Sequence, residues 1–154
     1  AAMRALNPFI TVKTYEQRLE EGTAAALIGG HDLVLDGTDN FDTRDLLNKV
    51  CTGLSVPLIS GAISQWEGQI SLFDPARGTP CYHRVFAGAG VAAPLPGVIG
   101  AMMAMEAVKH LVGAGETLAG RLLIHDALHM ETRMIMVKRR PHCPVCAAEN
   151  SVSR

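Results

Sequence analysis

The chain has 154 residues, the length of one domain or of part of one, because single domains close at roughly 100 to 200 residues. Its formal net charge of -1 provides no positive field for nucleic acid or for an anionic membrane, so neither is expected as a partner. Apolar residues make up 48% and charged residues 19% of the chain. This composition can bury a core and excludes an extended disordered segment.

The N-terminal third predicts short elements that lead into one buried strand. Residues 1–6 resemble the end of a helix, and residues 9–15 alternate like a strand near a sheet edge. Thr23 is expected to cap a short helix over residues 24–28. Residues 32–36 form a brief apolar run, which is typical of a strand buried on both faces of a parallel sheet.

Helices and strands alternate through the rest of the chain. Apolar residues at helical spacing predict helices over residues 41–52 and 98–112, which end at Gly53 and Gly113. Strands are predicted over residues 57–63, 69–73, 121–126 and 132–138. This order predicts an α/β fold: an incomplete Rossmann-like, doubly wound and mainly parallel sheet with a C-terminal antiparallel hairpin.

The chain gives no sign of export or of membrane insertion. Residues 85–105 carry no charge and approach the length of a spanning helix, but glycines and prolines break their first half. We interpret them as a buried loop followed by a core helix. The four cysteines are too few and too unevenly spaced for a disulfide scaffold, so a cytoplasmic location is expected.

Carboxylates follow the buried strand at residues 36–40. In an open α/β sheet, ligands bind beyond the carboxyl ends of strands, so Asp39 stands where phosphates and Mg²⁺ would lie. The alternative is structural: Asp36 would hydrogen-bond the loop, and Asn40 would cap the next helix. Spacing alone favours the structural interpretation.

Cys143 and Cys146 form a C-x-x-C pair, the spacing of half a tetrahedral zinc site. Cys81 could be a third ligand, with His83 or His142 as the fourth. Thiol redox chemistry is the alternative, but a redox C-x-x-C normally opens a helix after a strand, whereas this pair lies in a polar tail. Zinc is therefore the favoured interpretation.

Three other polar positions are interpreted as structural. Cys51 lies on the apolar stripe of its helix and is expected to be a core residue. His125, inside a strand, is expected to be a hydrogen-bonded core or edge histidine. Glu106 and His110, four residues apart on a helix, are expected to form a solvated face.

Several motifs, taken in order, resemble a known family, the ThiF/MoeB/HesA adenylyltransferases of the ubiquitin-activating-enzyme superfamily. The similarity runs over nearly the whole chain, which corresponds to the second half of that family's domain. The motifs that carry it are residues 32–40 with Arg44 and Asn48, residues 57–63 with residues 67–70, and residues 80–82, 96–100, 105–109 and 143–146.

The resemblance implies an activity and its site. Members of this family use ATP and Mg²⁺ to adenylate the C-terminal glycine of a ubiquitin-like sulfur-carrier protein, in molybdopterin or thiamine biosynthesis, and relatives are homodimers. By motif, Asp39 would be the catalytic residue that holds Mg²⁺ and the nucleotide phosphates. Asn40 and Arg44 would border that site, with Asp36 shaping the loop. The family's zinc site has two C-x-x-C pairs, and here Arg84 stands where the fourth cysteine would be.

The departures from the family limit what this chain is expected to do alone. The family's glycine-rich phosphate loop, its ribose-binding acid and its phosphate-binding Arg and Lys residues would all precede Ala1. We therefore interpret residues 1–154 as the C-terminal portion of one adenylyltransferase domain, with a Cys-containing tail at residues 139–154. Alone it is expected to be inactive. The alternative is a non-catalytic module for carrier binding or dimerisation.

Overall fold

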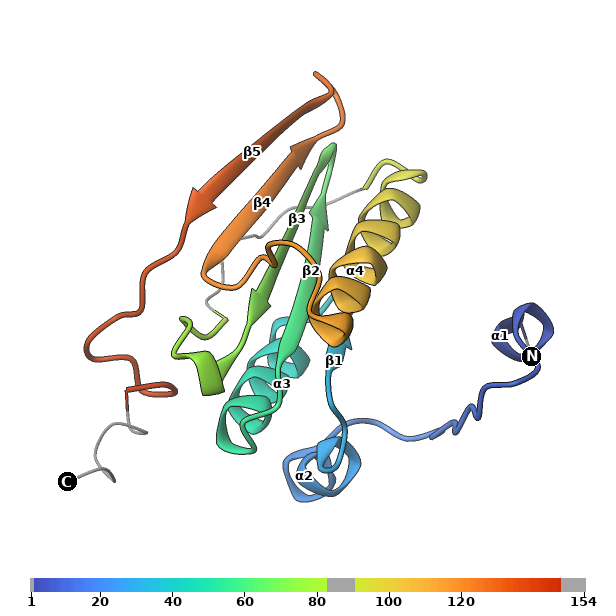
Figure 1. The fold of residues 1–154 in the computed structure, drawn as a ribbon, viewed down its shortest axis with the longest axis vertical. Helices are drawn as coiled ribbons and strands as arrows, with labels where there is room; N and C mark the ends of the chain where they lie inside the picture. Colours follow the sequence, from blue (N-terminus) through green and yellow to red (C-terminus); the bar gives the residue numbers. More distant parts are fainter. Residues whose placement is uncertain (1, 83–90, 148–154) are drawn as a thin grey trace.

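A computed structural model describes residues 2–82 and 91–147, and Figure 1 shows how they are arranged. His83, Arg84 and the region up to residue 90 lie outside the described residues. In chain order the elements are α1 (Ala2–Leu6), α2 (Glu21–Ile28), β1 (Val34–Asp36), α3 (Phe41–Gly53), β2 (Leu58–Ser64), β3 (Glu67–Phe73), the 3₁₀ turn η1 (Pro75–Arg77), α4 (Leu95–Val112), β4 (Arg121–Asp126) and β5 (Glu131–Met136).

The described strands form one mixed sheet in the order β1-β2-β3-β4-β5. β1 runs parallel to β2, and α3 is the connection between them. The pairs β2–β3, β3–β4 and β4–β5 are all antiparallel. The α/β class and the C-terminal hairpin are confirmed.

The predicted mainly parallel sheet is wrong, because most strand pairs of the described sheet are antiparallel. Ser64 pairs with Glu67, so two residues join β2 to β3, and so short a link can connect only antiparallel strands. After α4 the chain returns beside β3 and again runs antiparallel to it. Strand direction depends on these connections, and the apolar runs within the strands do not reveal it.

Helices cover the sheet on two faces, because neighbouring residues of a strand point to opposite sides. Ile59 packs in a cluster with Ile99 and Met103 of α4. Leu58 packs in a second cluster with Leu47 and Cys51 of α3, to which α2 also contributes. α3 and α4 therefore cover opposite faces of the sheet (Figure 1). The first residues of α3 lie just beyond the end of β1.

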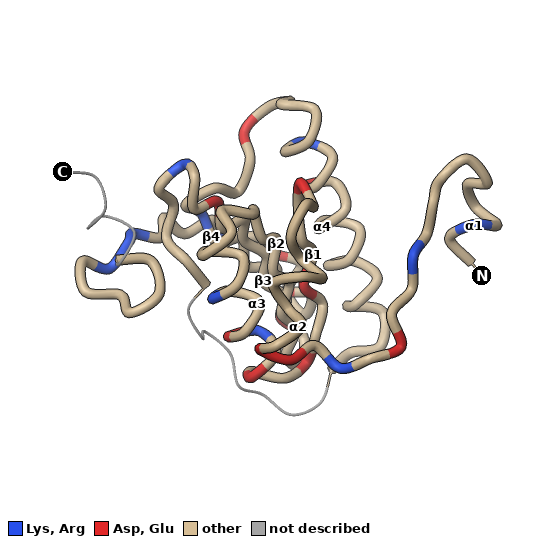
Figure 2. The backbone as a smooth tube through the Cα atoms, turned by 90° about the horizontal axis from the view of Figure 1, so that it is seen from below, with Lys and Arg blue, Asp and Glu red and all other residues tan. Residues whose placement is uncertain are grey.

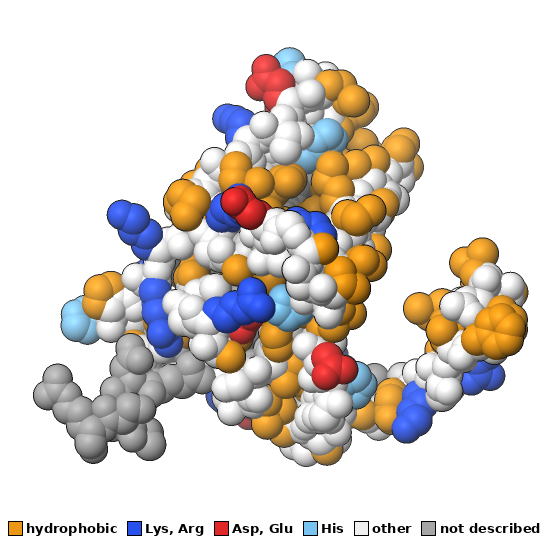
Figure 3. Space-filling model, in the orientation of Figure 1, with side chains coloured by type: hydrophobic (Ala, Val, Ile, Leu, Met, Phe, Trp, Pro, Cys, Tyr) orange, Lys and Arg blue, Asp and Glu red, His pale blue; other side chains and the backbone are white. Residues whose placement is uncertain are grey.

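Glycines in the sheet let α4 pack closely on it. A Cβ atom at Gly68 would lie 2.1 Å from Ile99 Cδ1, and one at Gly61 would lie 2.3 Å from Met103 Sδ. By length and composition alone, α4 could cross a membrane. Five of its residues are buried, among them Ile99 and Met103, which pack against the sheet. Its outer face carries exposed Met105, and apolar side chains gather on the side where α4 lies (Figure 3).

Glu106 corrects the prediction of a solvated face on α4. Its side chain is only 4% exposed. It accepts hydrogen bonds from Lys109 Nζ at 2.7 Å and from the backbone N–H of Leu118. Glu106 therefore connects α4 to the segment that leads into β4. His125 is buried as expected, with Nδ1 3.1 Å from Thr132 Oγ1.

The N-terminal segment differs from the prediction. Residues 9–15 form no strand, and residues 2–20 extend away from the sheet (Figure 1). An alternating sequence becomes a strand only where a neighbouring strand can accept its hydrogen bonds. α2 begins at Glu21 with Glu20 as its N-cap, and Thr23 accepts a hydrogen bond from the Glu20 N–H instead of capping the helix itself.

Candidate functional site

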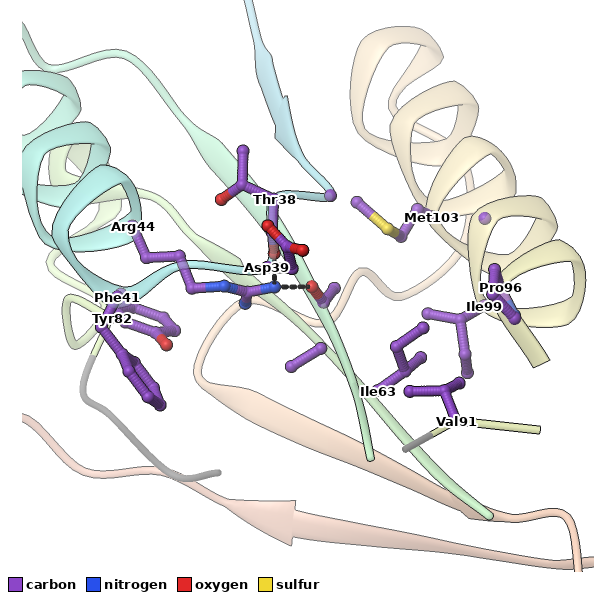
Figure 4. A pocket seen from close by; sticks show the side chains of 14 residues that line it. Thr38, Asp39, Phe41, Arg44, Ile63, Tyr82, Val91, Pro96, Ile99 and Met103 are labelled. Carbon is purple, nitrogen blue, oxygen red and sulfur yellow. Dashed lines mark hydrogen bonds between the residues drawn. The ribbon is translucent and has the colours of Figure 1, made fainter. Parts of the chain in front are cut away.

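A cavity of about 540 Å³ lies at the carboxyl end of β1 (Figure 4). Thr38, Asp39 and Arg44 line its polar part. Its opposite wall is apolar and includes Ile63 of β2 and Ile99 of α4. The cavity therefore combines one carboxylate with an apolar groove, at the end of the strands where α/β sheets bind ligands.

Asp36 shapes the loop that forms the polar part of the cavity. It is 2% exposed. Its Oδ1 accepts hydrogen bonds from Thr38 N at 2.9 Å and Thr38 Oγ1 at 2.7 Å, and its Oδ2 accepts one from Ser60 Oγ at 3.1 Å. These bonds turn the chain immediately after β1 and agree with the structural role expected of Asp36.

Arg44 is hydrogen-bonded to the protein through both terminal nitrogens of its guanidinium group. Nη2 donates to the carbonyl oxygens of Thr38 and of Gly61, the latter at 2.8 Å. Nη1 donates to Ser60 Oγ at 3.3 Å and lies 3.9 Å from Asp36 Oδ2. With 7% of its surface exposed, Arg44 joins α3, the loop and β2, and both of its terminal nitrogens already have partners in the protein.

Asp39 and Asn40 follow the Asp36 turn and lie in different environments. Asp39 is exposed and lines the cavity (Figure 4). Asn40 is the N-cap of α3: its Oδ1 accepts a hydrogen bond from Thr43 N at 2.8 Å, and it is not among the lining residues. The capping role considered for Asn40 is thus observed. Its nucleotide-binding role, like that of Asp39, stays a prediction.

Tyr82 forms an aromatic part of the cavity wall together with Phe41. Its backbone N–H donates to Asn48 Oδ1 at 2.8 Å, and its ring packs edge-on against Phe73 with the ring centres 5.9 Å apart. The sequence motifs include Tyr82 and Asn48 but did not predict that Tyr82 lines the cavity or that Asn48 anchors it. One feature of the sequence could have indicated the role of Asn48: it lies one helical turn after Arg44 and therefore on the same face of the helix.

The three predicted cysteine ligands come together in space. The Sγ atoms of Cys81, Cys143 and Cys146 all lie within 4.8 Å of one another, and Cys81 Sγ is 3.4 Å from Cys143 Sγ. Zn–S bonds of about 2.3 Å place tetrahedral thiolates about 3.8 Å apart, so this cluster fits three zinc ligands. Of the two candidate fourth ligands, His142 is exposed and outside the cluster, and His83 lies outside the described residues.

The cysteine environments differ in their effect on thiol ionisation. Burial raises the pKa of Cys81 to about 12, assisted by hydrogen bonds to the other two thiols. Burial also acts to raise the pKa of Cys143, but the backbone N–H groups of Cys146 and Val145 outweigh it and lower that pKa to about 7. Burial, together with the Asp36 charge, raises the pKa of Cys51 to about 11. Cys51 is therefore a core thiol, as expected.

Comparison with known proteins gives the same family as the sequence motifs. The model of the ThiF family matches residues 1–145. A sulfur carrier protein adenylyltransferase of Thermus thermophilus is 41% identical over 163 residues, which cover 96% of this chain and 60% of the relative. A molybdopterin-synthase adenylyltransferase of Escherichia coli K12 is 43% identical over 155 residues, which cover 94% of this chain and 62% of the relative.

Solved structures agree on the fold. A crystal structure of E. coli MccB with ATP superposes with a TM-score of 0.79 at 20% identity and covers 94% of this chain and 48% of that one. At this identity the likeness concerns the fold alone. The chain spans about 60% of the length of the two curated relatives.

Proposed function

We propose that this chain, which belongs to the ThiF family, is the C-terminal portion of an adenylyltransferase that activates a ubiquitin-like sulfur-carrier protein. The reaction joins the carrier's C-terminal glycine carboxylate to the α-phosphate of ATP and releases pyrophosphate. The observation that carries the proposal is Asp39, an exposed carboxylate that lines the cavity beyond the end of β1.

Asp39 suits a magnesium–nucleotide complex better than a bare nucleotide. A lone carboxylate would repel a triphosphate, but Mg²⁺ prefers one or two carboxylates together with waters and phosphate oxygens. Bound Mg²⁺ would supply positive charge where two anions, a carboxylate and a phosphate, must approach each other. Asp36 and Arg44 would act indirectly, because they hold the loop that presents Asp39.

The apolar half of the cavity suits the tail of a carrier protein. Gly61 and Gly100 both line it, together with Ile63 and Ile99. A Cβ at Gly100 would meet nothing within 4 Å, so this glycine leaves room for a backbone without large side chains, and the apolar residues can cover that backbone from water. The relatives support a sulfur-carrier substrate, since one of them is a sulfur carrier protein adenylyltransferase.

The charges around the cavity favour a nucleotide site that is completed by residues from outside this chain. Among the described residues that line the cavity, Arg44 is the one basic side chain, and both of its terminal nitrogens already donate to protein oxygens. Across the described chain, Lys and Arg are spread along the backbone trace instead of gathering at one place (Figure 2). We therefore propose that further cations come from sequence outside this chain, and that residues 1–154 alone do not catalyse adenylation.

ATP–pyrophosphate exchange tests the proposed function. The complete gene product, supplied with a Gly-Gly-ended carrier, should exchange labelled pyrophosphate into ATP, and Asp39→Ala should reduce the rate by at least about 100-fold. Asp32→Ala is the matched control, because Asp32 is an exposed carboxylate two residues before the start of β1. Equal rates for the two variants would reject the role of Asp39.

Among the described residues that line the cavity, no basic side chain is available to bind phosphates. This observation also favours a second candidate function, a carrier-binding module without turnover. Calorimetry separates the two. If residues 1–154 bind the carrier equally well with and without Mg-ATP, and the complete gene product shows no exchange, the binding module is supported and the adenylyltransferase is rejected.

A further inference from the structure

The cysteine cluster and the cavity are joined by one peptide bond. Cys81 belongs to the cluster and the next residue, Tyr82, lines the cavity. A change in the position of Cys81 therefore reaches the cavity wall directly. Nothing in the proposed adenylation chemistry uses this connection.

Cys81 and Cys143 are placed to react with each other. Their Sγ atoms lie 3.4 Å apart although the residues are 62 positions apart in the chain. A disulfide requires a separation of about 2.05 Å, so the sulfurs need to approach by little more than about 1 Å. Both residues are partly exposed, whereas Cys146 is only 3% exposed.

Tyr82 is held on the other side by contacts that do not involve the cluster. Asn48 Oδ1 of α3 accepts its backbone N–H at 2.8 Å, and the Phe73 ring packs against its ring. If the backbone of Cys81 moves toward Cys143, Tyr82 is displaced against these contacts or the contacts weaken. In either case the aromatic wall of the cavity changes.

We propose that Cys81 and Cys143 form a disulfide when a peroxide reaches the metal-free cluster, and that Tyr82 transmits this change to the cavity. The disulfide and a bound zinc ion are alternative states, because both need the same two sulfur atoms. The proposal adds redox regulation to the site of the proposed function, but the disulfide itself forms whether or not that function is correct.

The chemistry balances with one peroxide. One thiolate attacks a peroxide oxygen, the O–O bond breaks, and a sulfenic acid and hydroxide result. The second thiolate attacks the sulfenic sulfur, the S–S bond forms and the S–O bond breaks. Both leaving hydroxides take up the two thiol protons. Two thiols are oxidised to one disulfide, and hydrogen peroxide is reduced to two waters.

Peptide mapping by mass spectrometry tests the covalent step. Chain 1–154 freed of metal with a chelator and treated with hydrogen peroxide should yield a Cys81–Cys143 cross-linked peptide as its main disulfide. One equivalent of Zn²⁺ should slow formation of the Cys81–Cys143 disulfide at least fivefold. Cys51→Ala is the control, since Cys51 is 1% exposed and lies in another cluster. A Cys143–Cys146 disulfide, or equal rates with zinc, would overturn the proposal.

Fluorine NMR tests the transmission. The chain has two tyrosines, so 3-fluorotyrosine labelling gives two resonances, assigned with Tyr15→Phe. Oxidation should shift the Tyr82 resonance and leave that of Tyr15, which is 61% exposed in the N-terminal segment, unchanged. Cys143→Ser should abolish the shift. If oxidation forms the disulfide without moving the Tyr82 resonance, the connection to the cavity is refuted.

Discussion

Arg44 Nη2 donates a hydrogen bond to the Gly61 carbonyl oxygen at 2.8 Å, and the same nitrogen donates to the Thr38 carbonyl oxygen. One side chain of α3 thus connects the strand that carries the apolar groove to the loop that carries Asp39. The relationship explains how an exposed carboxylate can be held at a defined place on the cavity.

Replacing Arg44 should destabilise the fold. Arg44→Ala leaves the buried Asp36 carboxylate without its cation and two carbonyl oxygens without a donor, and should lower the free energy of unfolding by about 3 kcal/mol. Arg44→Lys should recover only part of this, because an ammonium cannot reproduce the guanidinium fork. Urea denaturation measures both changes.

Arg133 provides the control for Arg44. Its side chain is 62% exposed and lies 3.7 Å from Glu67, so Arg133→Ala should cost less than about 1 kcal/mol. If Arg44→Ala and Arg133→Ala lower the free energy of unfolding by similar amounts, the buried contacts of Arg44 contribute little to stability.

The close packing of α4 on the sheet predicts an effect of a single methyl group. In Gly68→Ala the new Cβ would lie 2.1 Å from Ile99 Cδ1, so the core must shift, and the free energy of unfolding should fall by about 1–3 kcal/mol. Gly22→Ala in α2 meets nothing within 4 Å and should be neutral or stabilising. Thermal unfolding followed by circular dichroism compares the two, and equal Tm values would refute the packing argument.

Local signals in the sequence predicted much of the fold. The run before Asp36 and the periodic residues after Asn40 correspond to β1 and α3, and Gly113, at φ 67°, ends α4 as expected. Strand direction was not predictable in the same way. It depends on which strands become neighbours, and neither the two-residue link after Ser64 nor the return of β4 beside β3 has a strong local signature.

The site was predictable where its contacts are local. Asp36 bonds Thr38 two residues away, and Asn40 caps a helix that begins at the next residue. The role of Asn48 depends on Tyr82, 34 positions further along the chain, and the burial of Glu106 depends on Leu118 in a separate segment. Such contacts arise only when distant segments pack, so helical spacing alone misplaced Glu106 on a solvated face.

The cysteine cluster predicts a bound metal. Chain 1–154 purified from cells without added zinc should contain about one equivalent of Zn²⁺ by elemental analysis, and Cys146→Ser should lose most of it. Removal by a chelator should lower Tm, because zinc bound to the folded state stabilises it. Cys51→Ala should keep its zinc, and less than a tenth of an equivalent in the unmodified chain would contradict the assignment.

The raised pKa of Cys51 predicts a loss of stability at alkaline pH. The folded chain keeps this thiol proton up to about pH 11, whereas an unfolded thiol loses it near pH 8.5. Between these pH values the folded state binds more protons than the unfolded state. The stabilising contribution of the Cys51 thiol to the free energy of unfolding is therefore complete below about pH 8.5 and is lost as pH rises. The unmodified chain should lose up to about 3 kcal/mol more than Cys51→Ala between pH 8.5 and 11 in urea denaturation. Parallel losses would show that Cys51 titrates alike in both states.

Anomalous diffraction tests the central claim, that Asp39 anchors a metal–nucleotide complex. Crystals of the complete gene product should be soaked with Mn²⁺ and a non-hydrolysable ATP analogue, because Mn²⁺ replaces Mg²⁺ and gives an anomalous signal. We expect a manganese peak within bonding distance of an Asp39 carboxylate oxygen and of the nucleotide phosphates. A nucleotide bound with its metal elsewhere, while Asp39 faces only solvent, would contradict the central claim.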